Sequence, residues 1–529
     1  MTRDFHLPGR SPAIACEAMA ATSHPLATLA AVETLKAGGT AADAAVTAVA
    51  TLCVVEPHMT GIGGDCFCLV KKPGAPPWGY NGSGRAAAAA RAEKFIAQGI
   101  TAIGTESIHA VTVPGAVEAW AAILAAHGRF GLDRALAPAI RYAEQGFAVT
   151  PRVAWDWALN AARLKSVADP GVARHYLKDG RAPQAGDVLE APALATAMKA
   201  IAAGGPRVVY EGPIAEDILA TVVPRGSLLT REDFANHKGD VVTPVSTNYR
   251  GLDVVQMPPN TQGLAALVLL NMFERFDMAA LAPLGAERAH LALEAARLAY
   301  AVRDTHVTDP AHMRVSVPAL LDKAFAARLA AKLDPDKRVA LPAAPAPGSD
   351  TTYVSVVDRD GTAVSLINSL FHLFGVAMAT ERTGILLQNR GSGFVVDPAH
   401  PNTIAPGKRP MHTIIPALGL NAGECDVCFG VMGGSFQAMG HAWFVSNLVD
   451  YGLDPQAALD VPRLFFDDER TMIERGIPAD TADGLKRRGH DVAVRESPLG
   501  GGQAIRIDRA RGVLIGGSDF RKDGCALGY

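Results

Sequence analysis

The chain has 529 residues, of which 49% are hydrophobic and 19% charged, and its formal net charge is −3. A chain of this size forms one large multilayer domain or two closely joined parts, and its balanced charge gives no indication of a nucleic-acid partner. The 7 cysteines are scattered along the chain and odd in number, which does not favour a disulfide framework.

The N-terminal segment, residues 1–12, lacks an apolar core of signal-peptide length and contains an acidic residue, Asp4. The longest uncharged apolar run, residues 44–55, is too short to span a bilayer. We therefore expect a cytoplasmic protein without a membrane partner.

Helices dominate the first half of the chain. A helix over residues 26–35 is expected after Ser23-His24-Pro25, and Thr40 is placed to cap a second, buried helix over residues 41–55. The glycine-rich run 61–65 leads directly into a strand, so it cannot be a phosphate loop and is better explained by close backbone packing. Further periodic runs predict a sheet covered by helices: helices 116–127, 134–146, 263–276 and 286–303, and strands 66–71, 241–245 and 252–256.

A Pro/Ala-rich linker over residues 341–349 precedes a strand with period-two alternation, residues 352–357. Turn residues 358–361 and a second run, 362–367, predict a hairpin. Beyond it we expect strands at residues 384–388 and 427–431, the second of which leads through Gly433 and Gly434 into a helix over residues 436–449. The free N–H groups at this helix start form a candidate oxyanion hole, with a glycine turn needed only for packing as the alternative.

Two close cysteine pairs, Cys66 with Cys68 and Cys425 with Cys428, are the candidate metal ligands of the sequence. Each pair lies in an apolar alternating run, and no second pair or histidine stands at the spacing a zinc site requires. We interpret both runs as buried strands, and the sequence implies no metal and no cofactor.

Thr351 stands between the linker and the predicted strand, which is the position of the nucleophile in a self-processing hydrolase. Its hydroxyl would attack the carbonyl of Asp350, and hydrolysis of the resulting ester would free the α-amine of Thr351. An α-amine has a pKa of about 7.7 to 8.0, so it would serve as the base in later attack on a substrate amide. The alternative is an ordinary surface hairpin after a linker.

Taken together, these stretches resemble the γ-glutamyltranspeptidase family of N-terminal-nucleophile hydrolases over almost the full length. No single motif carries the likeness, which rests on several stretches in the right order: residues 35–45, 113–117, 247–251, 257–259, 351–361, 408–410, 433–435, 517–519 and 528–529. The resemblance implies an α+β fold, a four-layer αββα sandwich. It also implies a precursor cut between Asp350 and Thr351 into a large piece, residues 1–350, and a small piece, residues 351–529, which together form one αββα unit.

By position in the family pattern, Thr351 matches the nucleophile, Gly433 and Gly434 match the oxyanion pair, and Ser369 stands where a threonine supports the nucleophile. A serine can make the same hydrogen bond. The implied partners are a small-molecule amide and the two pieces of the same precursor, and a dimer of the processed pair is compatible with the sequence.

The residues that grip a γ-glutamyl group match less well. Phe371 replaces an asparagine, Gly393 replaces the aspartate that holds the ammonium group, and His412 and Thr413 replace paired serines. Either Ser83 or Arg85 aligns with the arginine that binds the α-carboxylate. The site loses an acid and gains Arg390 and His412, so we expect it to be more positive than in the family pattern. Such a site suits a substrate with a carboxylate and no ammonium group. For Arg390, the alternative is a structural ion pair.

Residues 365–369 and 388–391 are most similar to the oxamate amidohydrolase branch, so the first hypothesis is an amidohydrolase for a small carboxylate-bearing amide. The alternatives are a γ-glutamyl hydrolase or transpeptidase acting on glutathione, and an acylase for glutaryl-type side chains, which the short segment between Phe394 and Lys408 favours. A non-enzymatic scaffold that never cleaves itself is the hypothesis from another class.

Overall fold

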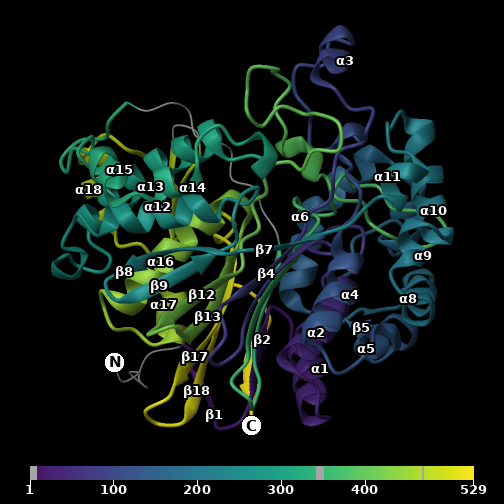
Figure 1. The fold of residues 1–529 in the computed structure, drawn as a ribbon, viewed down its shortest axis with the longest axis horizontal. Coiled ribbons are helices and arrows are strands. Elements are labelled where there is room, and N and C mark those ends of the chain that lie inside the picture. Colours follow the sequence, from purple (N-terminus) through teal and green to yellow (C-terminus); the bar gives the residue numbers. More distant parts are fainter. Residues whose placement is uncertain (1–8, 341–350, 468–469) are drawn as a thin grey trace.

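The computed structural model describes residues 9–340, 351–467 and 470–529. Within these ranges, two seven-stranded sheets pack face to face, with helices on both outer sides (Figure 1). This is the expected four-layer αββα sandwich, and all strand pairings in the two large sheets are antiparallel. None of the helices in the described ranges is long and apolar enough to cross a membrane.

The first sheet has the order β1 (Ala13–Ala15), β18 (Val513–Ser518), β17 (Gly501–Asp508), β13 (Glu424–Met432), β12 (Ala417–Asn421), β9 (Leu252–Gln256) and β8 (Val245–Tyr249). The second has the order β19 (Cys525–Gly528), β2 (Met19–Thr22), β10 (Thr352–Val357), β11 (Ala363–Ser369), β3 (Asp65–Lys71), β4 (Trp78–Gly82) and β7 (Asp240–Val242). Each sheet therefore contains strands from both sides of residue 350.

Helices from the first half of the chain cover the second sheet, on the right in Figure 1. The main ones are α1 (Pro25–Lys36), α2 (Ala41–Val55), α4 (Ala116–His127), α5 (Leu132–Gln145) and α8 (Pro192–Gly204). Around them lie α3 (Ala92–Ala97), α6 (Pro151–Val167), α7 (Pro170–His175), α9 (Arg207–Tyr210), α10 (Pro213–Val222), α11 (Arg231–Ala235) and a small pair of strands, β5 (Phe147–Ala148) and β6 (Val188–Leu189).

Helices from later in the chain cover the first sheet: α12 (Gly263–Phe273), α13 (Ala286–His306), α14 (Val317–Leu321), α15 (Lys323–Ala330), α16 (Gln437–Val449), α17 (Pro455–Asp460) and α18 (Ala479–Arg487). A small sheet of β14 (Leu464–Asp467), β15 (Arg470–Ile473) and β16 (Asp491–Val494) adjoins them. Two buried clusters form the core, one under each helical layer.

Helix α2 shows how local chemistry sets an element. Thr40 accepts from the Asp43 N–H while the Asp43 carboxylate accepts from the Thr40 N–H, which completes a capping box. Every residue of α2 is buried, as its all-round apolar sequence predicts.

Two expected strands differ from the structure. Residues 384–388 form no strand; they run as an irregular segment with a single bridge from Leu386 to Ala379, although their residues are buried. The apolar run at 241–245 is split between β7 in one sheet and β8 in the other, because the chain crosses between the two layers at this point. The cysteine pairs lie in buried strands, β3 and β13, as interpreted.

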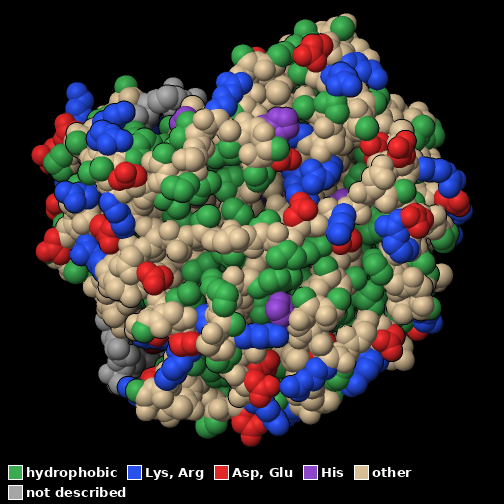
Figure 2. Space-filling view, viewed as in Figure 1, with side chains coloured by type: hydrophobic (Ala, Val, Ile, Leu, Met, Phe, Trp, Pro, Cys, Tyr) green, Lys and Arg blue, Asp and Glu red, His purple; other side chains and the backbone are tan. Residues whose placement is uncertain are grey.

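Acidic and basic side chains are interspersed on the face shown in Figure 2, and neither sign gathers into a large patch there. This distribution agrees with the small net charge of −3.

Candidate active site

The β10–β11 hairpin brings Thr351 next to Ser369. Thr352 pairs with Asn368 across the antiparallel hairpin. Thr351, which precedes Thr352, therefore faces Ser369, which follows Asn368. The Thr351 Oγ1 hydroxyl donates to Ser369 Oγ at 3.2 Å, and both side chains are fully buried. Asp350, the expected partner in cleavage, lies outside the described residues.

Ser369 also joins the nucleophile to its surroundings. Its Oγ accepts from the backbone N–H of Phe371 at 2.8 Å and from Nη2 of Arg390 at 3.4 Å. A Cβ added to Gly64 would lie 2.3 Å from the Ser369 carbonyl oxygen, so this position accepts only glycine. The glycine-rich run thus serves close backbone packing, as the sequence indicated.

The glycine pair lies at the end of β13, directly before α16. Gly433 (φ 114°) and Gly434 (φ 56°) both adopt left-handed backbone that favours glycine. The Gly433 carbonyl accepts from Phe436 N–H at 3.0 Å, and the Gly434 carbonyl accepts from Gln262 Nε2 at 2.9 Å. Among the described residues, the N–H groups of the two glycines have no acceptor, so they are available to an oxyanion.

Gln437, the first residue of α16, links the nucleophile to this turn. Its Nε2 donates to Thr351 Oγ1 at 3.3 Å, while its Oε1 accepts from Ile415 N–H at 3.1 Å. Because Ile415 N–H fixes the amide orientation, Nε2 is held as the donor toward Thr351.

Arg390 is a fully buried cation one hydroxyl away from the nucleophile. Besides the Ser369 contact, Nη1 donates to Thr413 Oγ1 at 2.9 Å, and within the described chain Nε has no acceptor. No described acid forms an ion pair with the guanidinium. Burial lowers the pKa of Arg390 to about 9, so it is still charged at neutral pH. The structural ion pair considered as an alternative is not present in the described residues.

Phe371 covers the other side of this cation. The Arg390 guanidinium carbon lies 4.0 Å from the centroid of the Phe371 ring, a cation–π contact. Phe371 has φ 84°, which is rare for a bulky residue and is found where surrounding contacts fix an unusual backbone. The ring therefore occupies a fixed place beside Arg390.

His412 differs from expectation, because it adds no positive charge to the site. Its Nε2 contacts Asp65 Oδ2 at 3.1 Å, and Ile414 N–H approaches Nδ1 at 3.4 Å. Burial, with Arg390 nearby, lowers the pKa of His412 to about 3, so the ring is neutral. The expected increase in charge comes from Arg390 alone.

Asp65 is the ionised partner of His412 and accepts four hydrogen bonds. Oδ1 accepts from Gly84 N–H, Gly115 N–H and Gln388 Nε2 at 2.9, 3.1 and 2.9 Å, and Oδ2 accepts from His412. Burial opposes ionisation, but these hydrogen bonds and Arg390 hold the pKa of Asp65 below its usual value. This carboxylate is already saturated with donors.

We expect Asp65→Asn to lower the free energy of unfolding by about 3 kcal/mol, because an amide places two donors among groups that are all donors. Denaturant unfolding measures the change, with Asp483→Asn as the control, since that carboxylate is 57% exposed and, among the described residues, is bonded only to Lys486. Equal stability of the two variants would contradict the assignment of Asp65 as a buried, ionised acceptor.

The two candidates for the carboxylate-binding position lie among other partners. Arg85 donates to the Gly407 carbonyl at 3.1 Å and approaches Asp240 and Asp309 at 3.5 and 3.7 Å. Ser83 Oγ accepts from Asn260 Nδ2 at 3.2 Å. Neither side chain forms a hydrogen bond or ion pair with Thr351, Ser369 or Arg390 among the described residues.

Three residues of this centre were not predicted from the sequence: Asp65, Gln262 and Gln437. Gln437 directly follows the Gly-Gly-Ser-Phe stretch, which is the one local signal that marks it. Gln262 binds both the Gly434 and the Thr413 carbonyls, and only tertiary contacts reveal it.

A buried threonine at the start of a central strand, a supporting hydroxyl and a glycine turn within an αββα sandwich define the N-terminal-nucleophile hydrolase class. The sequence model described as gamma-glutamyltranspeptidase matches residues 27–529. The chain belongs to the γ-glutamyltranspeptidase family.

Three relatives illustrate the range of this family. The chain is 38% identical to a glutathione hydrolase-like YwrD proenzyme of Bacillus subtilis, covering 97% of this chain and 99% of the relative. It is 34% identical to an oxamate amidohydrolase proenzyme of Klebsiella pneumoniae, covering 98% and 99%. A solved cephalosporin acylase from Bacillus halodurans is 38% identical, with a TM-score of 0.93 over 100% of this chain and 99% of that chain.

Proposed function

We propose that the protein is an autoprocessed amidohydrolase that cleaves a small amide bearing a carboxylate, with oxamate as the reference substrate. The observation that carries the proposal is Arg390, a fully buried cation with no acid partner among the described residues and one hydroxyl from Thr351. A substrate carboxylate would supply the missing counter-charge.

The chemistry begins with cleavage of the bond between Asp350 and Thr351, which leaves residues 1–350 and 351–529 folded together. The freed α-amine takes the Thr351 hydroxyl proton as Oγ1 attacks the substrate carbonyl. The N–H groups of Gly433 and Gly434 stabilise the oxyanion, and ammonia leaves with the returned proton. Water then hydrolyses the acyl-threonine ester, releases the dicarboxylate and restores the hydroxyl.

Arg390 and Thr351 both bind Ser369 Oγ, at 3.4 and 3.2 Å. This close arrangement favours a substrate whose carboxylate lies next to the scissile carbonyl. We therefore expect ammonia release to be fastest with oxamate and to fall through malonamate, succinamate and glutaramate. The measurement is coupled detection of ammonia under initial-rate conditions. Equal or rising rates along the series would contradict the assignment of oxamate and favour a glutaryl-type acylase.

Hydrolysis of γ-glutamyl compounds such as glutathione is the second candidate, which the name of the 38% identical Bacillus subtilis relative favours. That substrate needs an acid for its ammonium group, yet Asp65 is already saturated by four donors. Rapid, L-selective hydrolysis of a γ-glutamyl anilide would establish this candidate in place of the first.

Gln437→Met is expected to lower kcat on oxamate about tenfold, because Met keeps the shape but removes the donor to Thr351 Oγ1. Initial rates of the processed enzyme measure it. Gln503→Met is the matched control, since Gln503 is also fully buried and its amide has no partner in the described structure. Equal losses in the two variants would show that Gln437 matters only for packing.

The cytoplasmic location and the assembly of the processed pair remain predictions from the sequence. Gel filtration of the cleaved protein measures the second.

A further inference from the structure

The shape of the glycine turn depends on contacts from outside it. Gly433 and Gly434 both have positive φ, and glycine takes up several such conformations at little cost, so the turn does not fix its own N–H directions. The Phe436 N–H holds the Gly433 carbonyl from within the turn. Two side chains from elsewhere in the chain, those of Gln262 and Tyr300, hold the next two carbonyls.

Gln262 stands directly before α12 and holds the Gly434 carbonyl. Its Nε2 donates to this carbonyl at 2.9 Å and to the Thr413 carbonyl at 2.6 Å, and the residue is fully buried. A side-chain amide has donors at its nitrogen and an acceptor at its oxygen, so a half-turn would point the oxygen at both carbonyls. A partner for the oxygen is therefore needed to hold the amide in its orientation.

Arg303, in the last turn of α13, is that partner. Its Nη1 donates to Gln262 Oε1 at 2.6 Å. Because a guanidinium can only donate, it keeps the amide oxygen on its own side and Nε2 toward the turn, through a bond strengthened by the positive charge. The Arg303 side chain is fully buried, and its Nε donates to Asp304, whose carboxylate is 39% exposed. Removal of the arginine would thus leave this carboxylate in contact with water.

Tyr300 lies three residues earlier, on the same face of α13. Its hydroxyl donates to the Ser435 carbonyl and accepts from the Met439 N–H at 3.2 Å. The Arg303 guanidinium carbon lies 4.5 Å from the centroid of the Tyr300 ring, so the two side chains contact each other. Helix α13 precedes Thr351 in the chain and the glycine turn follows it, so the larger piece supports a turn that belongs to the smaller one.

We propose that Arg303 is a positioning residue for the oxyanion hole: through Gln262 it holds the N–H groups of the glycine turn in place before charge develops on the substrate oxygen. The inference rests on the proposed function in taking the Gly433 and Gly434 N–H groups as the oxyanion donors. Donors that are already oriented lower the barrier without reorganisation during the reaction. Tyr300 supports the same turn directly.

Arg303→Met tests this role in the processed enzyme. We expect kcat on oxamate to fall about thirtyfold while KM stays within about twofold, because the oxyanion exists only during the reaction. Arg303→Lys, which keeps the charge and a donor, should recover part of kcat. Arg288→Met is the matched control, since Arg288 is a fully buried arginine of the same helix that donates to Ser446 and Asn447. Its kcat should stay within about twofold of the native value.

A double-mutant cycle tests the route through Gln262. Gln262→Met removes the donor to the Gly434 carbonyl and should lower kcat about thirtyfold by itself. Adding Arg303→Met should then cost little more, because the amide that the arginine positions is already gone. Losses that multiply in the double variant would overturn this route.

The carboxylate side of the site offers a different explanation for a loss, because Gln262 also bonds the Thr413 carbonyl and the Thr413 hydroxyl accepts from Arg390. A weaker oxyanion hole lowers kcat equally for oxamate and oxamide, whereas a disturbed Arg390 changes the ratio of the two rates. A changed ratio in Arg303→Met, or a raised KM with unchanged kcat, would overturn the proposal.

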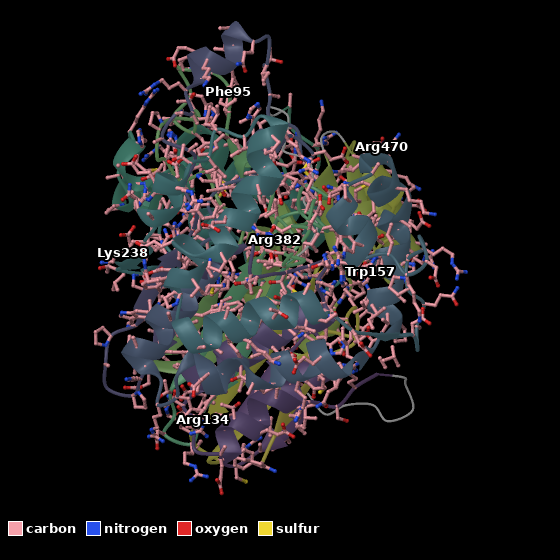
Figure 3. The ribbon with its side chains drawn as sticks, turned by 90° about the vertical axis from the view of Figure 1, so that its right-hand side faces the viewer. Phe95, Arg134, Trp157, Lys238, Arg382 and Arg470 are labelled. Atoms are coloured by element: carbon pink, nitrogen blue, oxygen red, sulfur yellow. The ribbon has the colours of Figure 1, made fainter. Side chains whose placement is uncertain are left out.

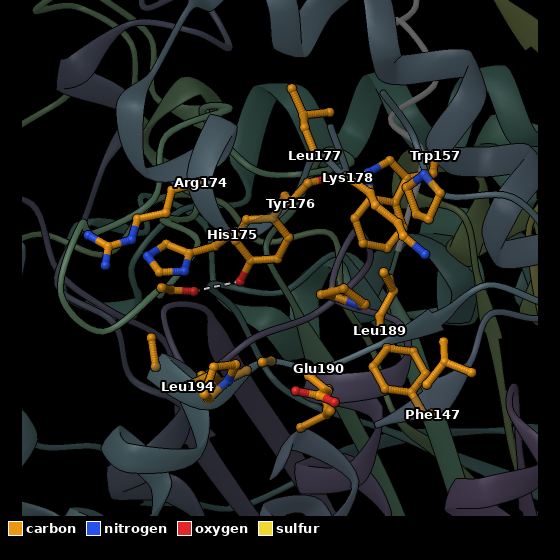
Figure 4. A pocket seen from close by; sticks show the side chains of 18 of the residues that line it. Phe147, Trp157, Arg174, His175, Tyr176, Leu177, Lys178, Leu189, Glu190 and Leu194 are labelled. Atoms are coloured by element: carbon orange, nitrogen blue, oxygen red, sulfur yellow. Dashed lines mark hydrogen bonds between the residues drawn. The ribbon is translucent and has the colours of Figure 1, made fainter. Parts of the chain in front are cut away.

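Tyr300→Phe tests the turn even where Arg303→Met fails to fold, and should lower kcat about tenfold with little change in KM. Tyr176→Phe is the matched control, because the Tyr176 hydroxyl is also buried and donates to a backbone carbonyl, that of Gly384, at 2.6 Å. Figure 4 shows this bond at a cavity of about 600 Å³ whose lining does not include the glycine turn, and Trp157, which lines the cavity, marks its place in Figure 3. Equal losses in the two variants would overturn the role of α13.

A native protein that releases no ammonia from oxamate would contradict the proposed substrate but not this inference. The variants are then compared by release of p-nitrophenol from p-nitrophenyl acetate, which acylates Thr351 through an oxyanion in the same hole, with Thr351→Ala as the blank. Equally fast release by the native protein and Arg303→Met would overturn the positioning role alone. A native protein that releases neither ammonia nor p-nitrophenol would overturn both proposals.

Discussion

Replacing Thr351 by alanine is expected to leave a single chain of 55.3 kDa, whereas the unaltered protein should give two species that correspond to residues 1–350 and 351–529. The alanine variant has no hydroxyl to attack the carbonyl of residue 350, so neither cleavage nor the free α-amine can arise. Amide hydrolysis should fall by about a millionfold, as when other covalent nucleophiles are removed. Intact mass under denaturing conditions and ammonia release measure the two effects.

Thr352→Ala is the matched control for this change. Thr352 is equally buried, but its hydroxyl donates to the Asn368 carbonyl at 3.3 Å and plays no part in the proposed chemistry. This variant should still be cut and active. Two fragments from Thr351→Ala would mean that the chain is cut elsewhere or by another agent. An uncut native protein would favour the hypothesis of a non-enzymatic scaffold.

The second large effect is expected at Arg390. Arg390→Gln should lower kcat/KM for oxamate by about a thousandfold, because the substrate carboxylate would enter a buried site without its cation. Turnover of oxamide, which has an amide in place of the carboxylate, should change much less. The ratio of the two rates therefore isolates the charge from any general damage to the site.

Two further measurements accompany this change. Arg85→Gln tests the other arginine and should alter the oxamate-to-oxamide ratio little, since Arg85 is bound by Asp240 and Asp309. Cleavage before Thr351 should persist in both variants, which would show that the nucleophile is intact. An Arg390→Gln enzyme that loses oxamate and oxamide activity equally would contradict a carboxylate-binding role.

Elements with strong local signals were predictable from the sequence. The capped helix α2 and the strand β9 begin and end where the apolar runs and breakers place them. The strand predicted at residues 384–388 was wrong, because an apolar run indicates burial but cannot distinguish a strand from an irregular buried segment. This segment packs against the glycine-rich run, where the Gln388 N–H donates to the Gly63 carbonyl. The split at 241–245 depends on the crossing between layers, which the sequence pattern does not encode.

The candidate site divides along similar lines. Thr351, Ser369 and the glycine pair stand at strand ends, where position along the chain predicts their neighbours. Gln437 lies 86 residues from Thr351 and reaches it only through packing. The neutral state of His412 was not predicted because it results from burial and from the nearby Arg390, and both arise only from tertiary packing.

Because each sheet combines strands from both sides of residue 350, cleavage would affect whether the enzyme can refold after it unfolds. Strands β10 and β11 are flanked by β2 and β3, and β12 is flanked by β9 and β13, so neither piece of a cut chain contains a complete sheet. The precursor folds as one chain, but separated fragments would have to find each other in solution, which depends on concentration. After cleavage, unfolding would therefore be difficult to reverse. The functional half-life of the enzyme would be set by its unfolding rate.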